Sequence, residues 1–184
     1  MKRLFYLIPF SRNLLTPLLS VMTAIMILTG CSSSKHASSS KHRCKTPPKT
    51  EISTKGLSKE RRLIVEEALK WEGTPYKYAG AERGKGTDCS GMVLAVYRDV
   101  ANVLLPRNSA KQAEFCHKLN KKEVRPGDLV FFATGKDPKR ISHVGIMLDD
   151  DNFIHASTSK GVVISQVSTP YYVRTFKGYG RALN

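Results

Sequence analysis

The sequence is poor in acidic residues and lacks the closely spaced cysteine pairs that bind structural metals. Its 184 residues include 15 Asp and Glu against 30 Lys and Arg, a formal net charge of +15, and none of its four cysteines forms a Cys-x-x-Cys pair. This spacing argues against a zinc module, and the lack of aromatic residues between the basic ones argues against a nucleic-acid partner. Such a length favours one domain of ~100–150 residues over a multidomain enzyme.

The N-terminal residues 1–30 have the pattern of an export signal. Basic residues near the start are followed by an uncharged stretch over residues 14–30. A transmembrane anchor is the competing interpretation, because this length is at the short end of the ~17–25 residues that span a bilayer. The stretch ends in Leu28-Thr29-Gly30-Cys31, which resembles the lipobox of bacterial lipoproteins. The resemblance implies a mature chain that begins at a lipidated Cys31, and Ser32 after it points to the outer membrane.

Residues 31–56 are predicted to form a flexible, basic tether. The run Ser-Ser-Ser-Lys-His occurs twice, at residues 32–36 and 38–42, and such low-complexity sequence is typical of a spacer. Six basic residues and one acid lie between Cys31 and Lys55. A basic segment beside an anionic membrane gains roughly 1 kcal/mol per Lys or Arg, so the membrane surface is the first partner to expect.

Residues 57–184 are predicted to form one α+β domain. The apolar period changes from helical to alternating along this segment, which places helices first and an antiparallel sheet of five or six strands second. The Gly- and Pro-rich segment 74–86 is expected to be irregular. Helices are predicted over residues 58–72, from Ser90 and after Pro106, and strands over residues 128–132, 143–148, 152–156, 161–165 and near 176–182.

Cys89 is the candidate nucleophile, because it lies where the Gly-rich loop ends and a helix begins. The helix N-terminus carries about half a positive charge and favours the thiolate. The thiol needs a base, and His143 and His155 fall on successive predicted strands. Counting across the intervening turn places them on one sheet face as diagonal neighbours, ~7–8 Å apart. This gives nucleophile, base and orienting group; the alternative is an inert buried cysteine.

Five segments together resemble the NlpC-type papain-like cell-wall hydrolases. The match covers about residues 57–182 and implies a papain-like fold and a cysteine peptidase that acts on peptidoglycan stem peptides or cross-links without a cofactor. By position, Cys89 would be the nucleophile, His143 the general base and His155 the orienting residue. The segments are Thr87-Asp88-Cys89-Ser90-Gly91, Leu105–Gln112, Arg125–Phe132, Ser142–Ile146 and Phe153–Ala156.

The same resemblance implies further residues around the nucleophile. Tyr76 corresponds to the Tyr that precedes the Gly-rich loop and lies beside the active site in this family. Asp88 and Ser90 match positions that hold the substrate's free amine in some members. The sequence departs from the family pattern at Ala79-Gly80, where a pair of glycines is usual.

Other polar groups have ordinary interpretations. Cys44, Cys116 and His117 lack metal-site spacing, and a disulfide between Cys44 and Cys116 is allowed after export but has a flexible partner. The acidic run that begins at Asp149 predicts a hairpin turn and not a calcium loop. Arg107 is predicted to pair with an acid or to cap the third helix.

Three function classes follow from these residues. The first is a monomeric, lipid-anchored peptidoglycan endopeptidase of the cell envelope. The second is a papain-like amidase or acyltransferase with the same Cys and His, distinguished by its product. The third is a non-catalytic lipoprotein that binds wall peptides, although such a module does not need Cys89, His143 and His155 together.

Overall fold

The computed structural model describes residues 52–183 as an α+β domain with a six-stranded antiparallel sheet. The sheet order is β3-β8-β4-β5-β6-β7, and β1 pairs with β2 in a separate hairpin. The helices are α1 (Lys59–Leu69), α2 (Cys89–Ala101), α3 (Ser109–Phe115), the 3₁₀ turn η1 (Lys121–Glu123) and α4 (Pro170–Thr175). The strands are β1 (Ala81–Glu82), β2 (Gly86–Thr87), β3 (His117–Leu119), β4 (Leu129–Phe132), β5 (His143–Met147), β6 (Asn152–Ser157), β7 (Gly161–Gln166) and β8 (Phe176–Arg181).

The predicted strands and the three predicted helices are present, with differences at their ends. The first helix ends at Leu69 and not at residue 72, because the chain turns over the next residues and reaches a positive φ of 80° at Gly73. The short strand β3 and helix α4 have too few residues to show an apolar period, and the sequence did not predict them. The sixth strand of the sheet is β3.

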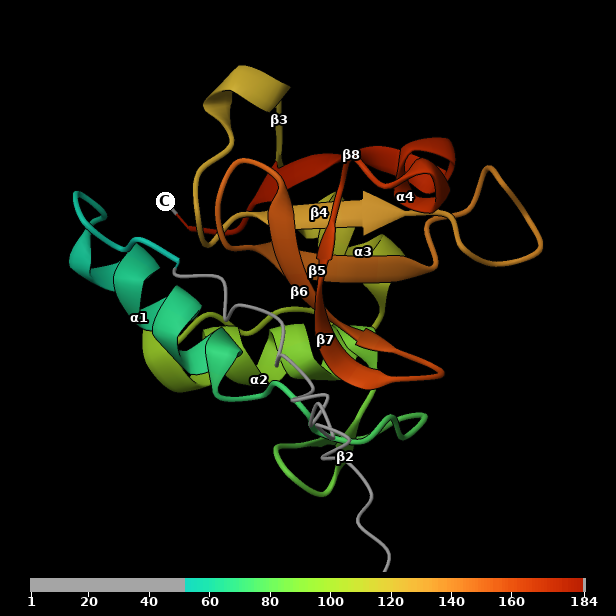
Figure 1. Ribbon diagram of the computed structural model, residues 1–184, viewed down its shortest axis with the longest axis horizontal. Helices are drawn as coiled ribbons and strands as arrows, with labels where there is room; N and C mark the ends of the chain where they lie inside the picture. Colours follow the sequence, from blue (N-terminus) through green and yellow to red (C-terminus); the bar gives the residue numbers. More distant parts are fainter. Residues whose placement is uncertain (1–51, 184) are drawn as a thin grey trace, which may run out of the picture. The chain divides into compact units, whose positions relative to one another are not determined.

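Helices α1 and α2 pack together on one face of the sheet (Figure 1). Ile64 and Val65 of α1 and Met92 and Val96 of α2 are fully buried there, in one cluster with Ile146 of β5. Burying an aliphatic side chain of this size stabilises a fold by roughly 1.5–3 kcal/mol. These buried side chains hold α2, and with it Cys89, against the sheet.

The opposite face of the sheet holds a smaller aromatic cluster. Phe132, Met147 and Phe153 are fully buried in this cluster, and Tyr172 of α4 and Phe176 pack against it. Side chains alternate between the two faces of a strand. Residues 143 and 155 therefore lie on this second face, together with Met147 and Phe153.

A buried carboxylate ties the helices to the sheet away from Cys89. Asp128 is 1% exposed and accepts hydrogen bonds from Arg61 of α1 at 3.0 Å and from Arg181 of β8 at 2.9 Å. The Tyr97 hydroxyl of α2 donates to the Gly127 carbonyl beside it. These bonds join α1, α2, β4 and β8 and fix the helices relative to the sheet.

The described residues begin at Ile52, five residues before the predicted start of the domain. Ile52 and Leu57 are partly buried against the core cluster that contains the two helices. The predicted boundary between the tether and the domain stays a prediction. The predicted signal, the lipidated Cys31 and most of the tether lie outside the described residues. Within residues 52–183, no helix has the length and hydropathy needed to span a membrane.

Candidate active site

Cys89 is the first residue of α2, and its position is fixed from both sides. Before it, Thr87 is held by backbone bonds to the loop that carries Tyr76: the Thr87 N–H donates to the Pro75 carbonyl and the Lys77 N–H to the Thr87 carbonyl. After it, the Asp88 side chain caps the helix by accepting from the Gly91 N–H at 2.8 Å. The loop and the cap together present the thiol at the helix N-terminus, as predicted.

The two strand histidines are in contact, and the register is the one that the sequence predicted. Ile146 pairs with Ile154 and Met147 with Phe153 across β5 and β6. Extending this pairing places residue 145 opposite residue 155, so the histidines are diagonal neighbours on one face. His143 Nε2 lies 2.9 Å from His155 Nδ1, and the two rings are nearly perpendicular at 84°. This contact leaves Nδ1 of His143 for a thiol proton.

The thiol and both imidazoles are uncharged in the resting protein. Burial raises the pKa of Cys89, the nearby Asp88 charge raises it further, and backbone N–H groups of Val144, Ser90 and Cys89 only partly offset this. Burial lowers the pKa of His143 to about 4, and burial together with His143 lowers that of His155 to about 3. The lowered Cys89 pKa expected at a helix N-terminus is not found, because burial and the Asp88 charge outweigh the backbone N–H groups. The thiol proton must instead be removed during the reaction.

The thiol lies at the start of strand β5. The backbone N–H of Val144, the residue after His143, is one of the groups that lower the pKa of the thiol, and α2 packs against β5. Helix α2 carries the candidate nucleophile, and strand β5, against which it packs, carries the candidate base His143. A Cys at a helix start beside a strand-borne His pair has the components of a thiol acyl-transfer site.

An ion-paired group of side chains, here named the Asp88 cluster, surrounds the start of α2. It consists of Asp88, Ser90 and Arg107 with the backbone of Ala79 and Gly80. Arg107 donates two parallel hydrogen bonds to Asp88, from Nη1 to Oδ1 and from Nη2 to Oδ2, both 2.8 Å long. It also donates to the Ser90 hydroxyl at 2.8 Å and to the Gly80 carbonyl at 3.0 Å. The prediction that Arg107 pairs with an acid is confirmed.

Asp88 and Ser90 are occupied by these internal bonds. Asp88 is 8% exposed and Ser90 7%, and the second Asp88 oxygen also accepts from the Ala79 N–H at 2.9 Å. Burial alone would raise the pKa of Asp88, but the hydrogen bonds from Arg107, Gly91 and Ala79 and the Arg107 charge hold it below its ordinary value. The predicted role of these two residues in holding a substrate amine stays a prediction, while their role in fixing the helix start is visible.

Tyr76 lies beside the nucleophile. It forms an isolated bridge with Thr87 and, like Cys89, is partly buried against the main core cluster. Burial and the neighbouring Cys89 and Asp88 raise the pKa of its phenol, so the hydroxyl is neutral at pH 7. The structure therefore places Tyr76 with the other predicted residues around Cys89.

Two hydroxyl groups that the sequence did not predict lie behind His155. Nε2 of His155 lies 3.0 Å from the Ser165 Oγ of β7 and 3.1 Å from the Tyr172 hydroxyl of α4. Phe153 pairs with Ser165 across β6 and β7, so Ser165 is diagonal to His155 as His155 is to His143. Counting this second register could have found Ser165, whereas Tyr172 comes from the unpredicted helix α4.

The remaining polar groups of the described domain lie apart from this site. Cys116 is a free, buried thiol whose pKa burial raises to about 12, and Cys44 is outside the described residues. The acidic run forms the predicted turn, in which Asp149 accepts from the N–H groups of Asp151 and Asn152. Within residues 52–183, no group of three or more Cys, His, Asp or Glu side chains converges as a metal site would.

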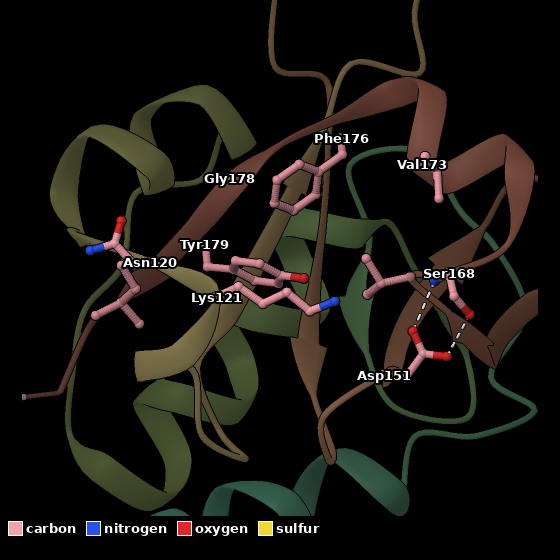
Figure 2. Close-up of a pocket in the computed structure, with 10 residues that line it drawn as sticks. Asn120, Lys121, Asp151, Ser168, Val173, Phe176, Gly178 and Tyr179 are labelled. Atoms are coloured by element: carbon pink, nitrogen blue, oxygen red, sulfur yellow. Dashed lines mark hydrogen bonds between the residues drawn. The ribbon is translucent and has the colours of Figure 1, made fainter.

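A cavity of about 410 Å³ opens between the β3–η1 segment and the end of β7, as Figure 2 shows. Phe176, Tyr179 and Val173 supply apolar lining, and Asp151 accepts two hydrogen bonds from Ser168 at its wall. Cys89 and the two histidines do not line this cavity.

Comparisons with known proteins agree with this fold. The sequence model of the NlpC/P60 family matches residues 73–181. Probable endopeptidase NlpC of Escherichia coli (strain K12) is 37% identical over 161 residues, which are 85% of this chain and 93% of that protein. Murein DD-endopeptidase MepS/Murein LD-carboxypeptidase of the same strain is 36% identical over 121 residues, 66% of this chain and 62% of that protein.

A solved structure has the same fold. The crystal structure of a Staphylococcus aureus protein described as similar to a lipoprotein of the NLP/P60 family superposes with a TM-score of 0.62 and 32% identity, covering 73% of this chain and 45% of that one. The α+β architecture with Cys89 at a helix start beside a histidine-bearing antiparallel sheet is thus a papain-like fold. The chain belongs to the NlpC/P60 family.

Proposed function

We propose that this protein is a cysteine peptidase that hydrolyses amide bonds in peptidoglycan stem peptides or cross-links and is anchored to a bacterial membrane through a lipid on Cys31. The observation that carries the proposal is the 2.9 Å contact between His143 Nε2 and His155 Nδ1, which leaves Nδ1 of His143 as the base for the Cys89 thiol of α2, the helix that packs against β5. Several relatives carry endopeptidase names, and one is named for murein, which supports the substrate class.

The reaction follows from the placement of these groups. Nδ1 of His143 takes the thiol proton as the Cys89 sulfur attacks the carbonyl carbon of the scissile amide. The backbone N–H groups at the start of α2 point toward the charge that develops on the carbonyl oxygen, because helix N-termini favour negative charge. Protonated His143 then gives its proton to the leaving amine and leaves a thioester on Cys89. Water, deprotonated by His143, hydrolyses the thioester to a carboxylic acid and the free thiol.

His155 acts on the base and not on the substrate. Its Nδ1 accepts the hydrogen bond that orients His143, and this bond strengthens when His143 becomes an imidazolium. Tyr76 borders the thiol, while Asp88 and Arg107 keep the helix start in place. In this mechanism Asp88 and Ser90 could bind a substrate amine only with atoms that already make hydrogen bonds within the Asp88 cluster.

Digestion of purified peptidoglycan followed by mass spectrometry of the products tests the activity. The mature protein should release fragments cut between two stem-peptide residues, with one new amine and one new carboxylate per cut, and Cys89→Ser should release none. A cut at the sugar–peptide amide, or transfer of an acyl group, would assign the amidase or acyltransferase class instead. Binding of peptidoglycan without any cleavage by the wild type would leave only the non-catalytic class.

The anchor is tested separately through Cys31. A Cys31→Ser change should block maturation, so the protein keeps its signal, runs larger on a gel and loses the partitioning of the processed lipoprotein into detergent. Ser33→Ala is the matched control and should mature normally. Unchanged size and partitioning of the Cys31→Ser protein would refute the anchor without touching the proposed peptidase activity.

A further inference from the structure

The histidine pair continues into two hydroxyl groups, and the four side chains form a set named here the histidine row: His143, His155, Ser165 and Tyr172. Three members come from adjacent strands, β5, β6 and β7, each diagonal to the next, and the fourth comes from α4. The Ser165 Oγ and the Tyr172 hydroxyl lie 3.0 Å and 3.1 Å from the same nitrogen, Nε2 of His155.

We propose that Ser165 and Tyr172 are positioning residues that act through His155, by accepting its Nε2 proton in a hydrogen bond when His143 takes the proton of the Cys89 thiol. The proposal deepens the peptidase function given above and rests on it for the step in which His143 is charged. It assigns no contact with the substrate to either residue.

Proton accounting supports this role. A hydroxyl both donates and accepts, so in the resting protein the row is satisfied with either tautomer of the neutral imidazoles. Once the thiol proton moves from Sγ to Nδ1 of His143, both nitrogens of that ring carry protons. His143 Nε2 can then only donate to His155, so His155 must accept at Nδ1 and carry its own proton at Nε2. One arrangement remains, and it needs an acceptor at Nε2.

Burial makes that acceptor necessary. His155 is 1% exposed, and its ring is stacked on Phe153 with centroids 4.8 Å apart, so water does not reach Nε2 freely. A buried donor without an acceptor pays the full cost of its desolvation. Two hydroxyls converge on one nitrogen, so either can serve if the other is removed. We therefore expect the loss of both to cost more than the product of the two single losses.

The test compares Ser165→Ala, Tyr172→Phe and the double variant in the mature protein. Tyr172→Phe keeps the ring packed against Phe132 and Phe153, so the change is confined to the hydroxyl. Tyr171→Phe on the same helix and Ser159→Ala in the turn between β6 and β7 are the matched controls, because within residues 52–183 the Ser159 hydroxyl bonds that of Ser157 and Tyr171 is 46% exposed.

Two readouts are measured: kcat and KM on peptidoglycan fragments, and the rate of Cys89 alkylation by iodoacetamide at pH 7, mapped by mass spectrometry. The double variant should lose about 10- to 100-fold in kcat with KM unchanged. Its alkylation should slow by a similar factor, because the thiolate forms together with the His143 imidazolium. Each single variant should lose about two- to fivefold, Ser165→Thr with Tyr172→Phe should recover most of the loss, and both controls should match the wild type.

The outcomes distinguish a failure of this proposal from a failure of the proposed peptidase function. Full kcat and full alkylation rate in a folded double variant would overturn it, as would a rise in KM alone. If the double variant does not fold, wild-type alkylation rates in both single variants overturn it and slowed rates in both support it. Failure of the wild type to cleave peptidoglycan would refute the proposed function only, because alkylation still reports proton transfer between Cys89 and His143.

Discussion

The candidate site has two polar regions, and they are built in opposite ways. The histidine row is uncharged, lies on a sheet face among aromatic rings and joins side chains of neighbouring strands. The Asp88 cluster is ionic, lies in loops around the start of α2 and joins a carboxylate to a guanidinium through two parallel bonds. The neutral side chains of the histidine row can take up a proton without moving far. The ion pair of the Asp88 cluster would lose hydrogen bonds if either partner moved or changed its charge. The first region fits the chemistry, and the second fits holding the thiol in place.

The largest difference between the two regions should appear in activity when the base is removed. His143→Ala should lower kcat on peptidoglycan fragments by at least ~10²–10⁴-fold, because it removes the group that takes and returns the proton. His155→Gln should keep part of the activity, since an amide oxygen can still accept from His143. Steady-state kinetics check both. A His155→Gln protein as inactive as His143→Ala, with an active His143→Gln protein, would reverse the two roles.

Acid should weaken the two regions in different pH windows. His143 and His155 have a lower pKa in the folded protein than the ordinary value near 6.5, at about 4 and about 3. The unfolded chain therefore binds protons first as the pH falls, and stability is lost between about pH 6.5 and pH 4. The Asp88 pKa is lowered as well, so the contribution of Asp88 is lost only below about pH 4.

Urea unfolding at pH 7, 5.5 and 4.5 measures the histidine window. The wild type should lose about 2 kcal/mol or more over this range, and a His143→Gln, His155→Gln protein should lose less. His117→Gln is the control, because this histidine is exposed at the far edge of the sheet. An equal loss in the double variant would show that the buried imidazoles do not carry the dependence.

In the Asp88 cluster, the main effect should be on stability. Arg107→Ala leaves the Asp88 carboxylate 8% exposed without its guanidinium partner. Breaking a fully buried pair costs ~3–5 kcal/mol, and because the Arg107 side chain is 40% exposed we expect about 2 kcal/mol here. Arg107→Lys should recover little, since an ammonium lacks the planar fork.

Thermal or urea unfolding checks the Arg107 prediction, with Arg98→Ala as the matched control. The Arg98 pair with Asp99 has side chains 48% and 45% exposed, so its loss should leave the stability almost unchanged. Equal effects of the two changes would mean that the Asp88 cluster adds no special support to the start of α2.

The smallest effect on stability should come from Ala79, which stands where the family usually has a glycine. Ala79 has a φ of +59°, a left-handed conformation that costs a side chain of this kind about 1 kcal/mol or more. Ala79→Gly should therefore stabilise the protein by up to ~1 kcal/mol, since the gain is partly offset by the greater freedom of the unfolded chain. Ala113→Gly, inside α3, should destabilise it by ~1 kcal/mol. Destabilisation by both changes in urea would contradict the assigned strain.

The sequence predicted the histidine row better than the Asp88 cluster, and the reason is geometric. A strand register follows from counting across a short turn, so the residues alone place His143 and His155 on one face, and Ser165 was within reach of the same count. The bonds of Asp88 with Arg107 and Ala79 join residues in irregular loops, where spacing sets no partner. For the same reason α4, a short helix in a loop, was missed, and with it Tyr172.

One expectation failed because position alone does not set a pKa. Cys89 does begin a helix, but the depth at which that helix packs was not visible in the residues. Burial and the Asp88 charge outweigh the backbone N–H groups and raise the thiol pKa. In the proposed mechanism, the thiol therefore depends on His143 for its proton transfer more than a preformed thiolate would.

Alkylation of the native protein by iodoacetamide at pH 8, with mass mapping of each cysteine, is the most direct test that His143 activates the Cys89 thiol and that the Asp88 cluster only holds it in place. Cys89 should be modified well before Cys116, whose pKa burial raises to about 12. His143→Ala should lower the alkylation rate of Cys89 at least about tenfold, while Arg107→Ala should change that rate much less. Preferential modification of Cys116, or an unchanged Cys89 rate without His143, would contradict the assignment of Cys89 and His143 as nucleophile and base.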